Sequence, residues 1–275
     1  MRQTPSRAPG GVRRTGLRLA LGAGAAGLLT SGCDARQAYE TTFGVGFPHP
    51  VTEQGKVTYD LWLGSSAAAA AVGVFVWLLI AFAGFRYRKK SEDLPRQVRY
   101  NLPIEVLYTV VPFVIIAVLF FYTAVGENKV NKLSPKPDVT IGVVGEQWNW
   151  QFHYTDAHVQ TTGVPGRPAQ LMLPVGKKIR FVETSPDVIH SFWVPKFLFK
   201  RDVVPGRQNT FEITVTKMGT YVGHCAELCG EKHDRMDFSV KVVSDADYQS
   251  YLSSLRADPS AADNGVTAAI PTGAN

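Results

Sequence analysis

Two long apolar stretches constrain the fold of this 275-residue chain more than any other feature. Residues 61–85 carry no charge, and residues 104–125 carry only Glu105. Each stretch is long enough to cross a hydrocarbon layer of about 30 Å as an α-helix. Lipid offers no hydrogen-bond partners, so such a segment must pair its own backbone groups, and an internal Pro112 is tolerated. The sequence therefore predicts a transmembrane helical hairpin over residues 61–125.

The position of the positive charge orients this hairpin. The chain has a formal net charge of +6, and the excess lies before Cys33 and in the loop that begins Arg-Tyr-Arg-Lys-Lys at Arg86. Residues from Gly126 onward carry equal numbers of acidic and basic groups. A short basic loop belongs on the cytoplasmic side, so both flanks of the hairpin are predicted to lie outside. No basic surface remains for nucleic acid, so we expect no nucleic-acid partner.

A cluster of soft ligand types lies in the second half of the chain. Cys225, Cys229, His233 and Met236 have the spacing Cys-x3-Cys-x3-His-x2-Met. These ligand types favour copper or zinc, and a thioether is a common axial ligand of copper but a poor one of zinc. One cysteine would suit a mononuclear blue-copper site, whereas two favour a dinuclear site with bridging thiolates. A disulfide outside the cell is the alternative for the two cysteines.

A further imidazole is assigned to His190, which we expect in a loop between Pro186 and Pro195. His190 followed by Cys-x-Glu-x-Cys-Gly-x2-His-x2-Met resembles subunit II of the haem–copper cytochrome c oxidases and its copper A centre. The segments GEQWNW at residues 145–150 and KRDVVPGR at residues 200–207 also resemble motifs of that family. The resemblance runs from about residue 61 to residue 243.

This resemblance implies a full ligand set for two copper ions. It consists of two bridging thiolates, two terminal imidazoles, a weak thioether and a weak backbone carbonyl. These ligands are Cys225, Cys229, His190, His233, Met236 and Glu227. The resemblance also implies that the Glu227 side chain helps to hold a magnesium ion shared with subunit I. A solvated loop carboxylate is the alternative for Glu227.

Two other residues gain a role through the resemblance. It implies that Trp148 receives electrons from a docked c-type cytochrome, and that Glu105 lies at the entrance of a proton path in subunit I. The alternatives are a core aromatic, which we prefer for Trp150, and a carboxylate that stabilises a helix N-terminus. Near His190, Asp187 is expected to fix the orientation of the imidazole ring.

Residues beyond 131 predict a β domain. Short alternating segments broken by Gly and Pro favour an antiparallel sandwich or barrel, and ligand loops at one end make it cupredoxin-like. The predicted strands are residues 139–144, 148–154, 170–174, 178–185, 208–215, 219–222 and 238–243. A short amphipathic helix is predicted over residues 245–256, and a disordered tail over residues 258–275. The fold class is thus membrane-anchored all-β, with a copper A domain over residues 126–257.

The first 32 residues predict a signal peptide, because a basic start is followed by a short apolar run and small residues. The segment LTSGC at residues 29–33 resembles a bacterial lipoprotein cleavage box, which would make Cys33 the lipidated first residue. Residues 33–60 then form an extracytoplasmic N-terminal segment.

The resemblance implies a function in respiration. The chain would accept electrons from a c-type cytochrome and pass them to haem a in subunit I, where oxygen is reduced to water with proton pumping. The complex would include subunit III and lie in a bacterial cell membrane, with the copper domain and both termini outside. Acidic residues of this domain could steer a basic cytochrome, namely Asp156, Glu183, Asp187, Glu231 and Asp234. The alternatives are a membrane-tethered copper electron carrier and a copper chaperone.

Overall fold

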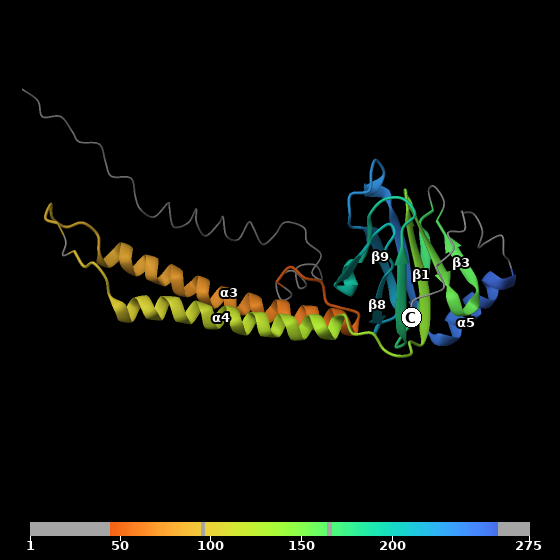
Figure 1. Cartoon of the computed structure of the whole chain (residues 1–275), viewed down its shortest axis with the longest axis horizontal. Helices are drawn as coiled ribbons and strands as arrows, with labels where there is room; N and C mark the ends of the chain where they lie inside the picture. Colours follow the sequence, from red (N-terminus) through yellow and green to blue (C-terminus); the bar gives the residue numbers. More distant parts are fainter. Residues whose placement is uncertain (1–44, 95–96, 164–166, 258–275) are drawn as a thin grey trace, which may run out of the picture. The chain divides into compact units, whose positions relative to one another are not determined.

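The computed structural model describes residues 45–94, 97–163 and 167–257 (Figure 1). Cys33, the predicted signal peptide and the predicted disordered tail lie outside the described residues. All the elements described below belong to one compact unit that begins at Phe47.

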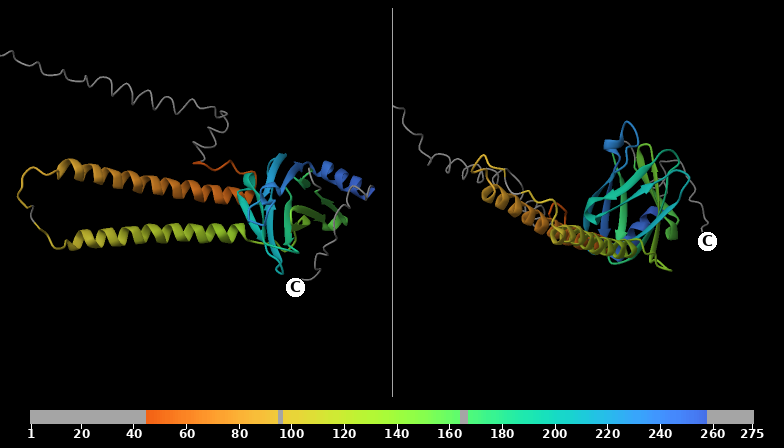
Figure 2. Two further views of the ribbon diagram at one scale, coloured as in Figure 1. Left: turned by 90° about the horizontal axis from the view of Figure 1, so that it is seen from above. Right: turned by 60° about the vertical axis from the view of Figure 1, so that its left-hand side comes forward.

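Two long helices come first, α3 (Glu53–Arg86) and α4 (Leu102–Val130). They run beside each other in opposite directions (Figure 2), and both are long and apolar enough to cross a membrane. Each extends past its uncharged stretch because polar residues continue the helix. The Thr52 side chain caps α3 by accepting a hydrogen bond from the Gly55 N–H at 2.9 Å. The helix therefore begins within the segment that the sequence predicts as extracytoplasmic.

The β domain contains two five-stranded sheets within the described residues, in the orders β3-β2-β1-β5-β8 and β4-β10-β9-β6-β7. The strands are β1 (Val139–Glu146), β2 (Asn149–Tyr154), β3 (Val159–Thr162), β4 (Ala169–Pro174), β5 (Lys178–Thr184), β6 (His190–Val194), β7 (Phe199–Val203), β8 (Asn209–Thr214), β9 (Gly219–Cys225) and β10 (Asp237–Val243). The predicted C-terminal helix is confirmed as α5 (Asp245–Ala257). Two apolar helices followed by a cupredoxin-like β domain confirm the predicted fold class.

Two details of the sequence prediction are wrong. The sheets are mixed rather than antiparallel, because β1 pairs with β5 and β4 pairs with β10 in parallel. His190 begins strand β6 instead of lying in a loop, since the residues that follow it pair with β7 and β9. The flanking Pro195 begins a 3-10 turn just after this strand. Strands β3 and β7 were also not predicted.

Aromatic rings fill the space between the two sheets. Phe192 of one sheet stacks on Phe238 at a centroid distance of 4.8 Å, and Phe181 stacks on Phe211 in the other sheet at 5.0 Å. Trp150 lies 5.3 Å from the Phe238 ring and is fully buried. Such pairs stabilise a core beyond the burial of their area. Trp150 is therefore a core aromatic, as the sequence favoured.

The core predicts that Gly223 of β9 cannot take a larger side chain. A Cβ atom at this position would overlap the ring of Phe238, which also contacts Trp150 and Phe192. We expect Gly223→Ala to lower the free energy of unfolding by about 1–3 kcal/mol, as overpacking of a filled core usually does.

Chemical denaturation of the full chain in detergent would measure this loss. The control is Val222→Ala in the same strand, where the side chain is 57% exposed and a change within about 0.5 kcal/mol is expected. Equal stability of Gly223→Ala and the parent would contradict the packing described here.

Candidate metal centre

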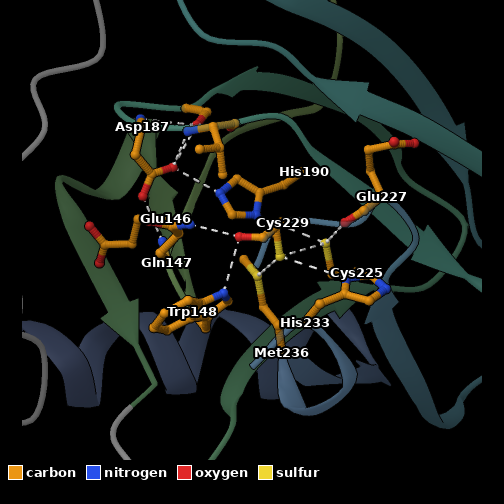
Figure 3. Close-up of polar contacts among 12 residues, drawn as sticks. Glu146, Gln147, Trp148, Asp187, His190, Cys225, Glu227, Cys229, His233 and Met236 are labelled. Atoms are coloured by element: carbon orange, nitrogen blue, oxygen red, sulfur yellow. Dashed lines mark hydrogen bonds and ion pairs between the residues drawn. The ribbon is translucent and has the colours of Figure 1, made fainter. Parts of the chain in front are cut away.

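Three side chains from different parts of the chain meet at one end of the sandwich. His190 begins β6 and Cys225 ends β9, and these two strands pair with each other. The ligand atoms of His190, Cys225 and Cys229 all lie within 4.8 Å of one another, and all three residues are buried (Figure 3). The two Sγ atoms are 3.8 Å apart and both cysteines are free, so they do not form the alternative disulfide.

The remaining candidate ligands surround this group. His233 Nδ1 lies 3.6 Å from Cys229 Sγ, and Met236 Sδ lies 3.8 Å from the same sulfur. His190 Nδ1 lies 3.9 Å from Cys225 Sγ, and the Glu227 carbonyl oxygen lies 3.3 Å from it. Two thiols, two imidazoles, a thioether and a carbonyl therefore converge at one place. This donor set fits a soft transition metal.

The loop that carries these groups is held by the backbone. The Cys225 N–H donates to the Met236 carbonyl at 3.1 Å, which closes the loop between β9 and β10. The Ala226 N–H donates to the Ser191 carbonyl at 3.0 Å, which ties the loop to β6. Gly230 has a φ of +121°, a conformation that favours glycine.

Asp187 fixes the ring of His190. Its Oδ1 lies 2.9 Å from His190 Nε2, while its Oδ2 accepts a hydrogen bond from the Gln147 N–H at 2.7 Å. The contact expected from the sequence is confirmed, and it leaves Nδ1 to face Cys225. Burial opposes ionisation of Asp187, but hydrogen bonds from His190, Gln147, Val188 and Ser185 outweigh it and lower its pKa.

The two thiols are electrostatically unequal. Burial disfavours both thiolates, but hydrogen bonds from His190 and nearby backbone groups lower the pKa of Cys225 to about 6. Burial and the neighbouring charge of Cys225 raise the pKa of Cys229. The pKa of His190 is raised despite its burial, because Cys225 and Asp187 both favour the imidazolium. A metal cation would stabilise both thiolates and displace the proton of the His190 imidazolium.

Trp148 is attached to the ligand loop. Its half-buried indole donates from Nε1 to the Cys229 carbonyl at 3.2 Å, and Lys232 Nζ lies 5.4 Å from the ring centroid. Gln147 Nε2 donates to the same carbonyl at 2.7 Å. Sequence reasoning did not single out Gln147, although it lies in the segment GEQWNW. The resemblance of that segment to a family motif was the signal that could have identified Gln147.

Other candidates lie apart from this group or face away from it. Glu227 turns its carbonyl toward Cys225 and its exposed side chain outward (Figure 3). Glu105 lies in the first turn of α4, where its Oε1 accepts a hydrogen bond from the Asn101 N–H at 2.8 Å. This contact is the helix-terminus alternative considered for Glu105. The side chain of His224, next to Cys225 in the sequence, pairs with Asp237 at 2.8 Å.

The inequality of the thiols predicts selective alkylation of the metal-free chain. In a Cys33→Ser, Cys229→Ser background, the reaction of Cys225 with iodoacetamide should rise through a pH of about 6, since the thiolate is the nucleophile. Adding His190→Gln should move this midpoint toward about 8.5, the value of a free cysteine. Mass spectrometry of quenched samples would measure both rates. A midpoint near 8.5 in the presence of His190 would contradict the described contact.

Comparison with known proteins identifies the family. The family described as "Cytochrome C oxidase subunit II, periplasmic domain" matches residues 166–243. The probable cytochrome c oxidase subunit 2 of Streptomyces avermitilis is 43% identical over 97% of this chain and 93% of its own length. Cytochrome c oxidase subunit 2 of Mycobacterium tuberculosis is 37% identical over 90% of this chain and 84% of its own. A crystal structure of the periplasmic domain of subunit II of the Bradyrhizobium japonicum oxidase is 32% identical, covers 46% of this chain and 98% of that one, and has a TM-score of 0.43. The identity and coverage of the two relatives show that the chain belongs to the cytochrome c oxidase subunit 2 family and is a membrane-anchored subunit of that oxidase complex.

Proposed function

We propose that this subunit takes up single electrons from a c-type cytochrome at a dinuclear copper A centre and passes them to haem a in subunit I. The family implies copper, and one observation carries the dinuclear form. Two free, buried cysteines have Sγ atoms 3.8 Å apart, and each contacts a different imidazole. A mononuclear blue-copper site would need only one thiolate.

These contacts support the ligand roles that the family resemblance implies. Cys225 and Cys229 would supply the thiolates that hold both ions, His190 and His233 would each supply an imidazole, and Met236 and the Glu227 carbonyl would be weak ligands. When bound, the copper pair supplies a site where one added electron is shared between two metals. We further propose that the outward Glu227 side chain holds a magnesium ion at the contact with subunit I.

The protein contributes rigidity to this centre. The Met236 carbonyl accepts hydrogen bonds from the Cys225 N–H and from Trp150 Nε1, both at 3.1 Å. Asp187 orients His190, and the buried Trp150 supports the loop from the core. Ligands that are locked by packing and hydrogen bonds move little when the charge changes. The site is therefore suited to electron transfer more than to delivery of copper, which requires ligands that release the metal.

Electron entry is proposed at Trp148, because its indole is hydrogen-bonded to the carbonyl of a bridging cysteine. Acidic residues around the site would steer a basic cytochrome. Glu231 and Asp234 are exposed and belong to the ligand loop, so they could do so. Asp156 is also exposed, but it contacts Thr140 near the start of β1, whereas His190 lies beside Gly145 near the end of that strand. Glu183 could not take part, because its side chain is fully buried. The expectation that Glu183 belongs to the docking surface is wrong. In the sequence it was indistinguishable from an exposed strand residue.

The membrane arrangement completes the proposal. The basic loop after α3 would lie in the cytoplasm, and the copper domain and both termini on the outer face of a bacterial cell membrane. Residues 1–32 would be removed as a signal peptide. If the leader is of the lipoprotein type, Cys33 would then be the lipidated first residue. Subunit III is proposed as a further partner, and Glu105 as the entrance of a proton path in subunit I. The domain boundaries stay those predicted from the sequence.

The ligand roles predict two copper ions per chain. The oxidised protein should be purple, and its electron paramagnetic resonance should be that of an electron shared by two coppers. Cys225→Ser should abolish this signal, whereas Met236→Leu should keep both ions and shift the reduction potential, because an axial thioether tunes more than it binds. Cys33→Ser is the matched control and should keep the parent signal. One copper per chain with a blue absorption band would refute the dinuclear centre.

The entry site predicts that affinity and electron transfer can be separated. Trp148→Ala should sharply slow the oxidation of cytochrome c by the purified oxidase, while copper content and cytochrome affinity stay close to the parent. Trp148→Phe keeps an aromatic ring but loses the indole N–H and its hydrogen bond to the Cys229 carbonyl, so an intermediate rate is expected. Stopped-flow absorbance would give the rates. A parent-like rate in Trp148→Ala would show that electrons enter elsewhere.

A further inference from the structure

Glu183 is a buried acid that the copper site does not use. It lies in β5 on the same face as Phe181, and its side chain is completely buried. Neither carboxyl oxygen has a hydrogen-bond partner within residues 45–94, 97–163 and 167–257. An ionised carboxylate in such a place would be very costly, so the group is expected to bind a proton instead.

The charged groups that act on Glu183 come from the other sheet. Val143 of β1 and Asn209 of β8 flank Glu183 in its own sheet and carry no charge. From the facing sheet, β7 contributes Arg201 and Asp202. Arg201 donates from Nη2 to Asn131 Oδ1 at 2.6 Å, but its Nε is buried and has no hydrogen-bond partner in the part of the chain that the structure describes. The inward ionisable group of the neighbouring β6 is His190.

These charges act on the acid in opposite directions. Burial raises the pKa of Glu183 well above its ordinary value, the guanidinium of Arg201 lowers it, and the carboxylate of Asp202 raises it. The acid is thus held between a strong desolvation cost and a nearby positive charge. A further positive charge in the vicinity would favour release of the proton.

The metal centre is such a charge. Val143, opposite Glu183, lies two residues before Gly145, and a Cβ on Gly145 would lie 3.2 Å from His190 Cβ. Two residues along a strand and one strand across correspond to a separation on the order of 10 Å from the imidazole. At an effective dielectric constant of about 20, a unit charge at that distance changes a proton-binding constant by roughly tenfold.

We propose that Glu183, whose buried carboxyl oxygens have no hydrogen-bond partner among the described residues, is a proton-binding site whose occupancy follows the charge of the metal centre. This inference rests on the proposed electron-accepting function. When the cytochrome donor supplies one electron, the charge of the centre falls by one and the Glu183 carboxylate binds up to one proton from bulk water. Oxidation of the centre releases the electron and the proton. The proton partly compensates a charge change that would otherwise be uncompensated in the interior.

Potentiometric titration of the copper-loaded full chain in detergent, between about pH 5 and pH 9, tests this site. A Glu183 carboxylate stabilises the oxidised centre, so the reduction potential of the parent should fall as the pH rises. Glu183→Gln mimics the protonated acid. At high pH, the variant should therefore have the reduction potential that the parent has at acidic pH. Its equilibrium constant for accepting an electron should then be roughly tenfold larger than that of the parent at the same high pH.

The matched control is Glu212→Gln. Glu212 is also buried, but its carboxylate accepts hydrogen bonds from Arg180 and Ser134. Its substitution should leave the pH dependence of the potential unchanged. If the parent and Glu183→Gln respond to pH identically, the proposal is overturned.

A metal-free measurement separates this proposal from the copper function. Because folding raises the pKa of Glu183, the folded state binds more protons, and the stabilisation should be lost as the pH rises from about 4.3 toward the folded pKa. Glu183→Gln should remove that loss in unfolding experiments, and infrared spectra of the parent at neutral pH should contain a carboxylic-acid band that the variant lacks. If the chain bound no copper pair, the measured copper content would contradict the copper function, but the pH-dependent unfolding and the infrared band would still be observed. Absence of the band at neutral pH would overturn the proposal even if copper binds.

Discussion

The pairing of β9 with β6 and β10 is the interaction on which the rest of this site depends. It brings Cys225, at the end of β9, next to His190, at the start of β6. The turn into β10 then returns Met236 to the Cys225 backbone through a hydrogen bond of 3.1 Å. Ligands from two distant segments converge because strand register leaves no freedom in their spacing. The metal loop is therefore an extension of the sheet, and its geometry is as rigid as the ladder beneath it.

The aromatic core supports this register from the other side. The rings of Phe238, Phe192 and Trp150 pack against one another under the ligand loop. At position 223 only glycine fits, because the Phe238 ring leaves no room for a side chain. Trp150 also donates to the carbonyl of Met236. Core packing and ligand geometry thus share the same residues, so a change in one is expected to disturb the other.

The interior treats its ionisable groups in two ways. Asp187 and Glu212 each accept hydrogen bonds from several donors, which makes them parts of the scaffold. Glu183 has no hydrogen-bond donor among the described residues, and burial favours its neutral form by raising its pKa. A domain that changes its internal charge with every electron has a use for such a group, because one proton can offset the added charge where water cannot reach.

Sequence alone determined the hairpin, the β class of the domain and the identities of the candidate ligands, since these depend on local composition and on residue types at short spacings. The loop from Cys225 to Met236 was visible for that reason. Only the tertiary structure decided that His190 lies on a strand, that two strand pairs are parallel, that Gln147 contacts the ligand loop, and that Glu183 is buried. Strand order and side-chain burial depend on contacts between segments far apart in the chain, and short-range patterns contain no information about them.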